Sequence, residues 1–140
     1  MQNKTQIFEK TVNNLLLDKK VFVPMACDLI HEGHINVLEK ASKYGDVVVG
    51  LLTDKAIATY KPLPTLSYEK RKKIILSLKF VTSVYKTTEW DFKSALEKLK
   101  PEVVVHGDDW KSNNQKQSRK NVIKQIKKWN GRLVEPPYTK

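Results

Sequence analysis

Hydrophobic residues along this chain form two kinds of pattern. Short, nearly continuous apolar runs at residues 21–26, 46–52 and 103–105 are typical of strands that are covered on both faces. Weaker runs at 81–85 and 133–134 predict two more strands. Between the runs, apolar residues recur every three or four positions, which predicts helices that bury one side. The chain therefore alternates strands with helices.

Four helices are expected among these strands, and each carries one apolar stripe. The first follows His34 and ends at Gly45, a residue that commonly terminates helices. The second begins after Ser67, whose hydroxyl is expected to cap it. The inward-facing positions of the last three helices are Ile74, Ile75 and Leu78, then Phe92, Ala95, Leu96 and Leu99, then Val122, Ile123, Ile126 and Trp129.

The alternation predicts an α/β fold with a Rossmann-like, three-layer architecture. We expect an open parallel sheet of about five strands with helices on both faces, formed by residues 20–140 as one domain. Residues 1–19 are expected to form an amphipathic helical extension before it. Ligands of such sheets bind beyond the carboxyl ends of the strands. His31, Lys61 and residues 106–109 all follow strand ends and are expected to converge on one crevice.

The most informative motif lies where the first strand passes into the first helix, at residues 31–34. A helix that begins there points unpaired N–H groups and the positive end of its dipole at the preceding loop, which favours phosphate. Gly33 lets an anion approach the backbone, and His31 and His34 can donate hydrogen bonds to it. Zinc is disfavoured, because zincins space their histidines by four residues. An ordinary helix start with two incidental histidines remains the alternative.

Composition narrows the function classes. The 140-residue chain has no apolar run of transmembrane length and no secretory signal pattern, and its single cysteine, Cys27, fits a reducing cytoplasm and a packed side chain. The net charge is +11, and residues 111–140 carry nine basic residues against the single acid Glu135. This balance favours anionic partners, although most of these lysines are expected on solvated faces. Nucleic acid is an unlikely partner, since the motifs of such modules are absent.

Three segments, in order, resemble one known family. Residues 25–34 resemble the signature of cytidylyltransferases that carry the histidine-x-glycine-histidine motif. Residues 107–110 resemble a second signature, from the glycerol-3-phosphate cytidylyltransferase branch, and residues 67–72 are similar to the segment between them. The resemblance extends over residues 20–140, and residues 106–111 look closest to nucleotidyltransferase domains linked to phosphoenolpyruvate phosphomutases in phosphonate pathways.

The resemblance implies transfer of CMP from CTP to a phosphate or phosphonate oxygen, with release of pyrophosphate. It makes His31, His34 and Lys61 the expected catalytic residues, with Mg²⁺ bound together with CTP rather than in a metal site of the protein's own. The expected nucleotide-binding residues are Met25, Ala26, Cys27, Gly33, Arg71, Gly107, Asp108 and Asp109. Two of these residues and the neighbouring Trp110 have structural alternatives. Arg71 could lie on a solvated helix face, Asp109 could hold its own loop, and Trp110 could serve in packing.

The acceptor is expected to be a small alcohol or amine that carries a phosphate or phosphonate, bound by Asp28, Lys79 and Trp90. Asp28 has a structural alternative, the capping of a turn. The family has an arginine where this chain has Lys79, and lysine lacks the bidentate fork, so the acceptor site is expected to differ from one for glycerol phosphate. Family members also continue past residues 135–140 into a Gly-Ile-Ser-Thr-Thr segment, before which this sequence stops.

Two other functions stay open. An adenylyltransferase of the same superfamily would share the two histidines and prefer ATP. A nucleotide-binding or partner-docking module without turnover would bind the triphosphate and release no pyrophosphate. A homodimer is expected by analogy with the family.

Overall fold

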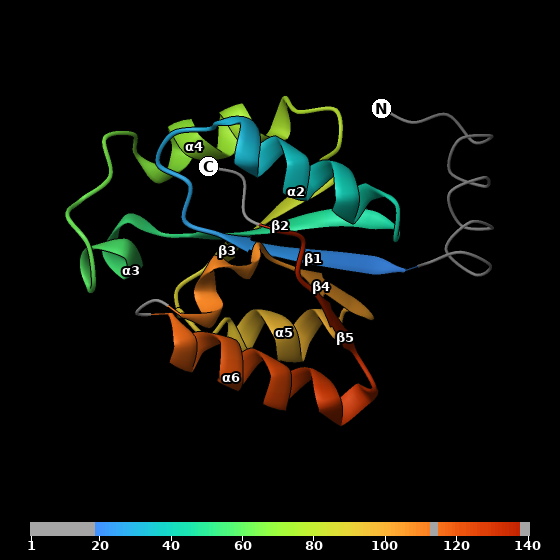
Figure 1. Cartoon of the computed structure of the whole chain (residues 1–140). Coiled ribbons are helices and arrows are strands. Elements are labelled where there is room, and N and C mark those ends of the chain that lie inside the picture. Colours follow the sequence, from blue (N-terminus) through green and yellow to red (C-terminus); the bar gives the residue numbers. More distant parts are fainter. Residues whose placement is uncertain (1–18, 113–114, 138–140) are drawn as a thin grey trace.

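The computed structural model describes residues 19–112 and 115–137, and it has five parallel strands between two layers of helices (Figure 1). The strands are β1 (Lys20–Met25), β2 (Asp46–Leu52), β3 (Ser83–Thr87), β4 (Val103–Val105) and β5 (Arg132–Val134). The helices are α2 (Glu32–Ser42), α3 (Asp54–Ala58), α4 (Tyr68–Leu76), α5 (Lys93–Leu99) and α6 (Lys116–Ile126), with short 3₁₀ turns at Asp108–Lys111 and Lys127–Trp129. The predicted N-terminal helix, within residues 1–18, lies outside the described residues.

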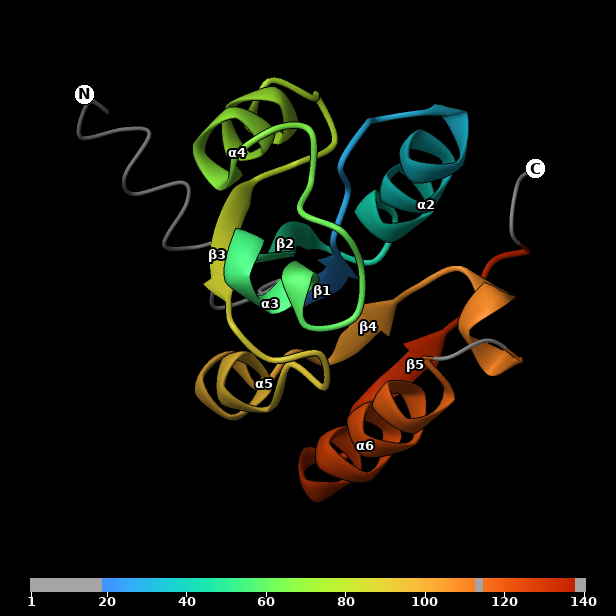
Figure 2. The same cartoon turned by 90° about the vertical axis from the view of Figure 1, so that its left-hand side faces the viewer.

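The strands lie in the order β3-β2-β1-β4-β5, and every neighbouring pair is parallel. Helices α2 and α4 cover one face of the sheet and α5 and α6 the other, while α3 lies beyond the strand ends (Figure 2). The predicted Rossmann-like fold is therefore confirmed. The chain changes direction across the sheet between β1 and β4, and this switch point is where open α/β sheets bind their ligands.

Alternate residues of each strand supply the two cores. Val21 and Val23 of β1 pack toward α2 and α4, whereas Phe22 between them packs toward α5 and α6. Gly50 of β2 makes room for that phenyl ring, since a Cβ at this position would lie 2.1 Å from Phe22 Cζ. Burial on both faces explains why β1 and β2 read as continuous apolar runs.

Several local predictions need correction. Ile74 is 41% exposed and does not face inward, although its neighbour Ile75 is fully buried. The third strand runs over Ser83–Thr87 rather than 81–85, because Val81 still belongs to the preceding turn and donates its N–H to the Leu78 carbonyl at 3.1 Å. Ser67 stands at the N-cap of α4 with extended backbone, but its side chain makes no capping hydrogen bond. Helix α3 was not predicted, because five residues are too few to show a helical period.

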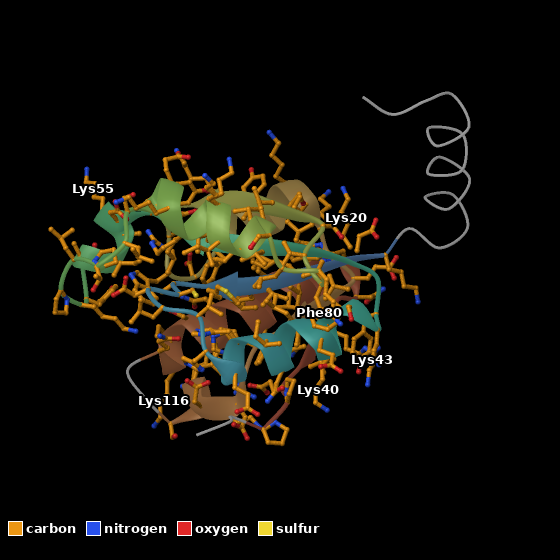
Figure 3. All side chains as sticks on the ribbon, turned by 90° about the horizontal axis from the view of Figure 1, so that it is seen from above. Lys20, Lys40, Lys43, Lys55, Phe80 and Lys116 are labelled. Carbon is orange, nitrogen blue, oxygen red and sulfur yellow. The ribbon has the colours of Figure 1, made fainter. Side chains whose placement is uncertain are left out.

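The basic residues labelled in Figure 3, among them Lys40, Lys43 and Lys116, are exposed at the periphery of the molecule. Two described basic residues of the C-terminal stretch pair with a carboxylate: Arg119 binds both oxygens of Glu135 at 2.9 and 3.0 Å, and Lys111 lies 3.8 Å from the same carboxylate. Within residues 19–112 and 115–137, no helix has the length and apolar character that a membrane crossing requires.

Candidate active site

A cavity of about 250 Å³ lies beyond the carboxyl ends of β1 and β4, beside the start of α2. It brings together side chains from four loops that are far apart in the sequence, those after β1, α3, β3 and β4. Its lining includes Met25, Ala26, Cys27, His31, Gly33, His34, Lys61, Trp90, His106, Gly107, Asp109 and Gln115. Most of the predicted site residues are therefore in one place. Asp108 is not among the lining residues, and its N–H is bound by the Pro136 carbonyl at 3.1 Å.

His31 and His34 cap the first turn of α2 reciprocally. Nδ1 of His31 accepts the Gly33 N–H at 3.0 Å, and Nδ1 of His34 accepts the His31 N–H at 3.2 Å. The two rings are tilted by 43° with centroids 4.0 Å apart. Two imidazoles thus occupy the capping-box positions that are usually filled by a hydroxyl and a carboxylate. The spacing of three residues between the histidines follows from this geometry.

The capping bonds also fix where the protons of the two rings lie. A nitrogen that accepts a backbone N–H carries no proton, so each neutral ring is protonated on Nε2. Burial, assisted by the charge of His31, lowers the pKa of His34 from 6.5 to about 4, so at pH 7 this ring is neutral. The pair therefore offers two Nε2–H donors, next to a helix N-terminus, to an anion in the cavity.

The chain turns sharply after β1. Cys27 has a left-handed backbone with φ of 48°, and its side chain is buried. Desolvation raises the pKa of its thiol to about 12, so at neutral pH it is protonated and not a nucleophile. The expectation of a packed cysteine is confirmed.

Arg71 lies beneath the cavity and is only 1% exposed, so its predicted alternative of a solvated helix face is wrong. It does not line the cavity. Its guanidinium donates instead to the carbonyls at the ends of β1 and β2, to a loop carbonyl and to a carboxylate of α3, at distances of 2.6–3.1 Å; these partners are Ala26, Leu52, Leu66 and Asp54. Arg71 therefore joins the segments that form the floor of the site.

Asp28 holds the loop that carries Lys61. Its Oδ1 accepts the Leu66 N–H at 3.0 Å, across 38 residues of sequence. Hydrogen bonds from the backbone of Thr65 and Leu66 hold the pKa of this carboxyl below its usual value. The structural alternative predicted for Asp28 was the capping of a local turn. The structure has a long-range hydrogen bond instead, which ties the β1–α2 loop to the α3–α4 loop.

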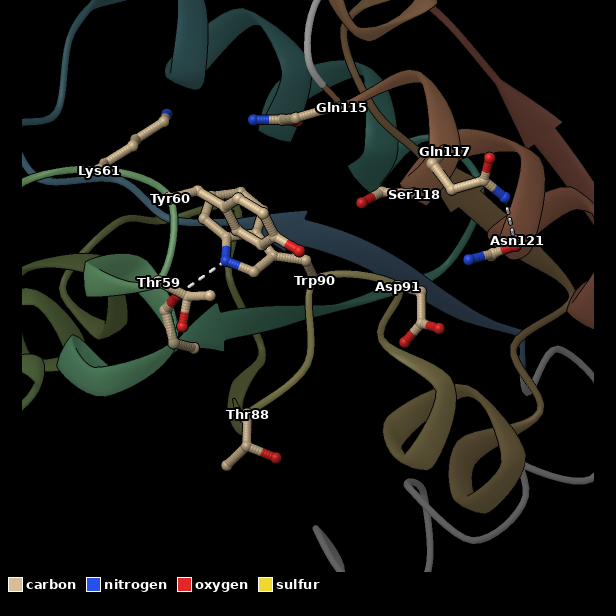
Figure 4. Close-up of a pocket in the computed structure, with 11 residues that line it drawn as sticks. Thr59, Tyr60, Lys61, Thr88, Trp90, Asp91, Gln115, Gln117, Ser118 and Asn121 are labelled. Carbon is tan, nitrogen blue, oxygen red and sulfur yellow. Dashed lines mark hydrogen bonds between the residues drawn. The ribbon is translucent and has the colours of Figure 1, made fainter.

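A larger cavity, of about 540 Å³, adjoins the first, since Lys61, Trp90 and Gln115 line both. Trp90 is anchored because its Nε1 donates to the Ala56 carbonyl at 2.7 Å, and Tyr60 packs edge-on against it (Figure 4). Lys61 Nζ lies 5.6 Å from the Trp90 ring centroid. The other lining residues are mainly hydroxyl- and amide-bearing: Thr59, Thr88, Asp91, Gln117, Ser118 and Asn121, with Ala56.

Two other predicted residues lie apart from both cavities. Lys79 is exposed in the turn between α4 and β3, on the side of the sheet where strands begin, next to Phe80. Within one chain this position does not fit the predicted role in acceptor binding. Trp110 packs in the core at 1% exposure and donates to Glu135 at 2.6 Å, so its packing role is confirmed.

The position of His106 in the crevice was predicted, because it directly follows β4, but no motif assigned it a role of its own. Its ring stacks on Trp110 with centroids 3.7 Å apart. Tyr60 and Gln115 were not predicted as residues that line the cavities. They lie in segments without periodicity, and nothing in their sequence context indicates a cavity.

Comparison with known proteins identifies the family of the chain. A family described as Cytidylyltransferase-like matches residues 27–136, which include both histidines and the 106–111 segment. The chain belongs to the cytidylyltransferase-like family. This result confirms the resemblance to cytidylyltransferases, whereas the link to phosphonate pathways stays a prediction.

The similar curated proteins carry more than one name. A glycerol-3-phosphate cytidylyltransferase of Bacillus spizizenii is 38% identical over 95 residues, covering 66% of this chain and 74% of the relative. An FAD synthase of Ferroglobus placidus is 35% identical over 91 residues, covering 65% of this chain and 60% of the relative. An ethanolamine-phosphate cytidylyltransferase of Dictyostelium discoideum is 34% identical over 92 residues, covering 64% of the chain and 26% of the relative. The match thus spans about 60% of the length of that FAD synthase.

Solved structures support the fold independently. A Thermoplasma volcanium protein described as a lipopolysaccharide core biosynthesis protein superposes with a TM-score of 0.72 over 87% of this chain and 98% of its own, at 21% identity. A pantothenate synthetase from Thermus thermophilus superposes with a TM-score of 0.62 over 87% of this chain and 56% of its own. At 21% and 12% identity, these likenesses concern the fold alone.

The described residues contain no group of three or more histidine, cysteine or acidic side chains placed to hold a metal ion. The carboxylate that lines the smaller cavity is Asp109. This donor set fits the way proteins bind Mg²⁺ with nucleotides, in which one or two carboxylates and the phosphates themselves hold the ion.

Proposed function

We propose that this chain is a cytidylyltransferase domain that transfers CMP from CTP to a small acceptor bearing a phosphate or phosphonate. The observation that carries the proposal is the pair of imidazoles at the start of α2, each with Nδ1 occupied by a backbone N–H. Their Nε2–H groups are fixed donors for the triphosphate, and they need no reorganisation when charge develops on it. The family match and the Bacillus relative support the same chemistry.

In this reaction an oxygen of the acceptor attacks the α-phosphorus of CTP. A bond forms between that oxygen and the phosphorus, the bond to the β-bridging oxygen breaks, and pyrophosphate leaves with the bonding pair. The acceptor oxygen is already anionic, so no general base is required. Catalysis is then a matter of placing two anions in line and stabilising the charge between them.

Each side chain has a role in this proposal. His31 and His34 hold the phosphates through Nε2–H, and Lys61, exposed where the two cavities meet, neutralises oxygens of donor and acceptor alike. Asp109 lies on the nucleotide side. Mg²⁺, bound with the triphosphate, would withdraw charge from its oxygens.

The larger cavity is the proposed acceptor side. Its lining of hydroxyls, amides and the Trp90–Tyr60 pair suits a small polar molecule attached to a single phosphate or phosphonate group, which would lie at Lys61. Asp28 acts there through the loop that it holds rather than by direct contact, because its carboxylate is engaged by Leu66. The homodimer expected from the family is part of this proposal and is tested by sedimentation velocity.

The test is steady-state release of pyrophosphate from CTP in the presence of a panel of phosphate and phosphonate alcohols and amines. We expect turnover with CTP that depends on one acceptor class and is lost in His31→Ala. Turnover with ATP alone would assign adenylyl transfer instead, which the FAD synthase relatives favour as the second candidate. Tight CTP binding without pyrophosphate release for any acceptor would assign a binding module.

A further inference from the structure

His106 differs from the two capping histidines in the state that its surroundings impose. Its Nδ1 lies 2.8 Å from the carbonyl oxygen of Gly107. A carbonyl oxygen can only accept a hydrogen bond, so Nδ1 of His106 carries a proton. In His31 and His34 the same atom accepts from the backbone, so it carries none. The cavity thus contains two kinds of histidine.

The position of the ring leaves one edge to the cavity. One face of His106 is covered by the parallel indole of Trp110, with 9° between the planes, and the Nδ1 edge is turned to Gly107. His106 nonetheless lines the smaller cavity. The remaining edge carries Nε2, for which no hydrogen bond is formed within the described part of the chain.

The protonation state of the ring follows from burial. Desolvation lowers the pKa of His106, against the opposing effects of the Gly107 carbonyl and of the Asp109 and Glu135 charges. At pH 7 the ring is neutral, with its one proton on Nδ1. Nε2 therefore presents a lone pair, and it can only accept a hydrogen bond.

We propose that Nε2 of His106 accepts a hydrogen bond from the exocyclic amino group of the bound nucleobase and so selects an amino-bearing base over its oxo counterpart. The inference rests on the proposed function, because it places a nucleotide in this cavity. A lone pair that faces the N–H of an amino group forms a bond, whereas the same lone pair against a carbonyl oxygen leaves two acceptors opposed and desolvated. His31 and His34 would hold the phosphates, and His106 would read the base.

The test uses matched nucleotide pairs that differ in this group. CTP is compared with UTP, and ATP with inosine triphosphate, by calorimetric titration of the full chain with Mg²⁺. We expect the wild-type chain to bind the amino-bearing member of the pair that it prefers roughly 10- to 100-fold more tightly than the oxo member. The readout is this ratio, so the inference does not depend on whether the chain uses CTP or ATP.

Three variants separate the functions of the ring. His106→Asn keeps an amide N–H near the position of Nδ1 and removes Nε2, and His106→Phe keeps a ring to stack on Trp110 and removes both nitrogens. His106→Gln places an amide oxygen near the position of Nε2. We expect the first two to lower the amino-to-oxo ratio to about 1–3 while triphosphate binding persists, and the third to restore part of it.

Each outcome decides a different claim. If His106→Asn and His106→Phe both keep the wild-type ratio of amino-to-oxo binding affinity, the inference is overturned and the proposed function stays intact. The same holds if Asp109→Asn abolishes the ratio and the His106 variants do not, since the base would then be read by that carboxylate. A wild-type chain that binds no triphosphate contradicts the proposed function and this inference with it.

Discussion

The two adjoining cavities differ in how their side chains are held. In the smaller one, His31 and His34 are fixed by backbone N–H groups, and His106 is fixed by a carbonyl and a stacked indole. In the larger one Trp90 is anchored, but Tyr60 is 66% exposed and Lys61 is exposed beside it. Fixed groups lose little freedom when a ligand binds, whereas exposed side chains must be ordered at that moment. The proposed nucleotide side is preorganised, and the proposed acceptor side can adapt.

The largest expected effect comes from buried Arg71, which joins the segments beneath the smaller, preorganised cavity. Arg71→Met removes a buried guanidinium and leaves three backbone carbonyls and Asp54 without their donor. We expect the free energy of unfolding to fall by about 3–5 kcal/mol, because each buried acceptor that loses its donor costs about 1–3 kcal/mol. Urea denaturation measures it. Lys72→Ala, on the same helix, is the matched control and should change stability by less than about 0.5 kcal/mol.

A substitution in the smaller cavity tests whether its fixed donors contribute to turnover. His34→Ala removes one fixed donor, and we expect kcat for pyrophosphate release to fall by roughly 10²–10³-fold. His34→Gln keeps an N–H near the position of Nε2 and should lose less. If both variants retain wild-type turnover, the imidazole does not contact the reacting phosphates.

The pH dependence of stability tests the protonation state of His34. The pKa of His34 is lowered from 6.5 to about 4, so between these values the unfolded chain binds more protons than the folded one. The stability contributed by His34 is present above pH 6.5 and is lost as the pH falls toward 4. We expect wild-type stability to decline over this range more steeply than that of His34→Gln in parallel urea titrations. Equal slopes would place the His34 pKa near its ordinary value.

The smallest effect on stability is expected on the adaptable side. Lys61 is exposed and forms no ion pair with any described residue, so Lys61→Ala should leave the free energy of unfolding within about 0.5 kcal/mol of wild type. Turnover should nevertheless fall roughly 10- to 100-fold, because a charged donor to the phosphates is lost. Lys55→Ala, exposed on α3 and outside both cavities, is the control and should retain wild-type turnover.

The same contrast explains what the sequence could predict. The buried strands β1 and β2 are continuous apolar runs, and the histidine pair opens the helix that follows β1, so the fold and the position of the histidine pair could be predicted. The role of Arg71 could not be predicted, because a basic residue in a lysine-rich helix gives no sign that its partners lie in other segments. The proton position of the His106 ring could not be predicted either, because it depends on Trp110 and Gly107 in the folded chain.

The central claim is that the two-histidine cavity binds CTP. The most direct measurement is a calorimetric titration of CTP and of ATP, each with Mg²⁺, into the wild-type chain and into His31→Ala. We predict that the wild-type chain binds CTP more tightly than ATP and that His31→Ala abolishes the CTP isotherm while the variant stays folded by circular dichroism. A preference for ATP, or a CTP isotherm that is the same in both proteins, would contradict the claim.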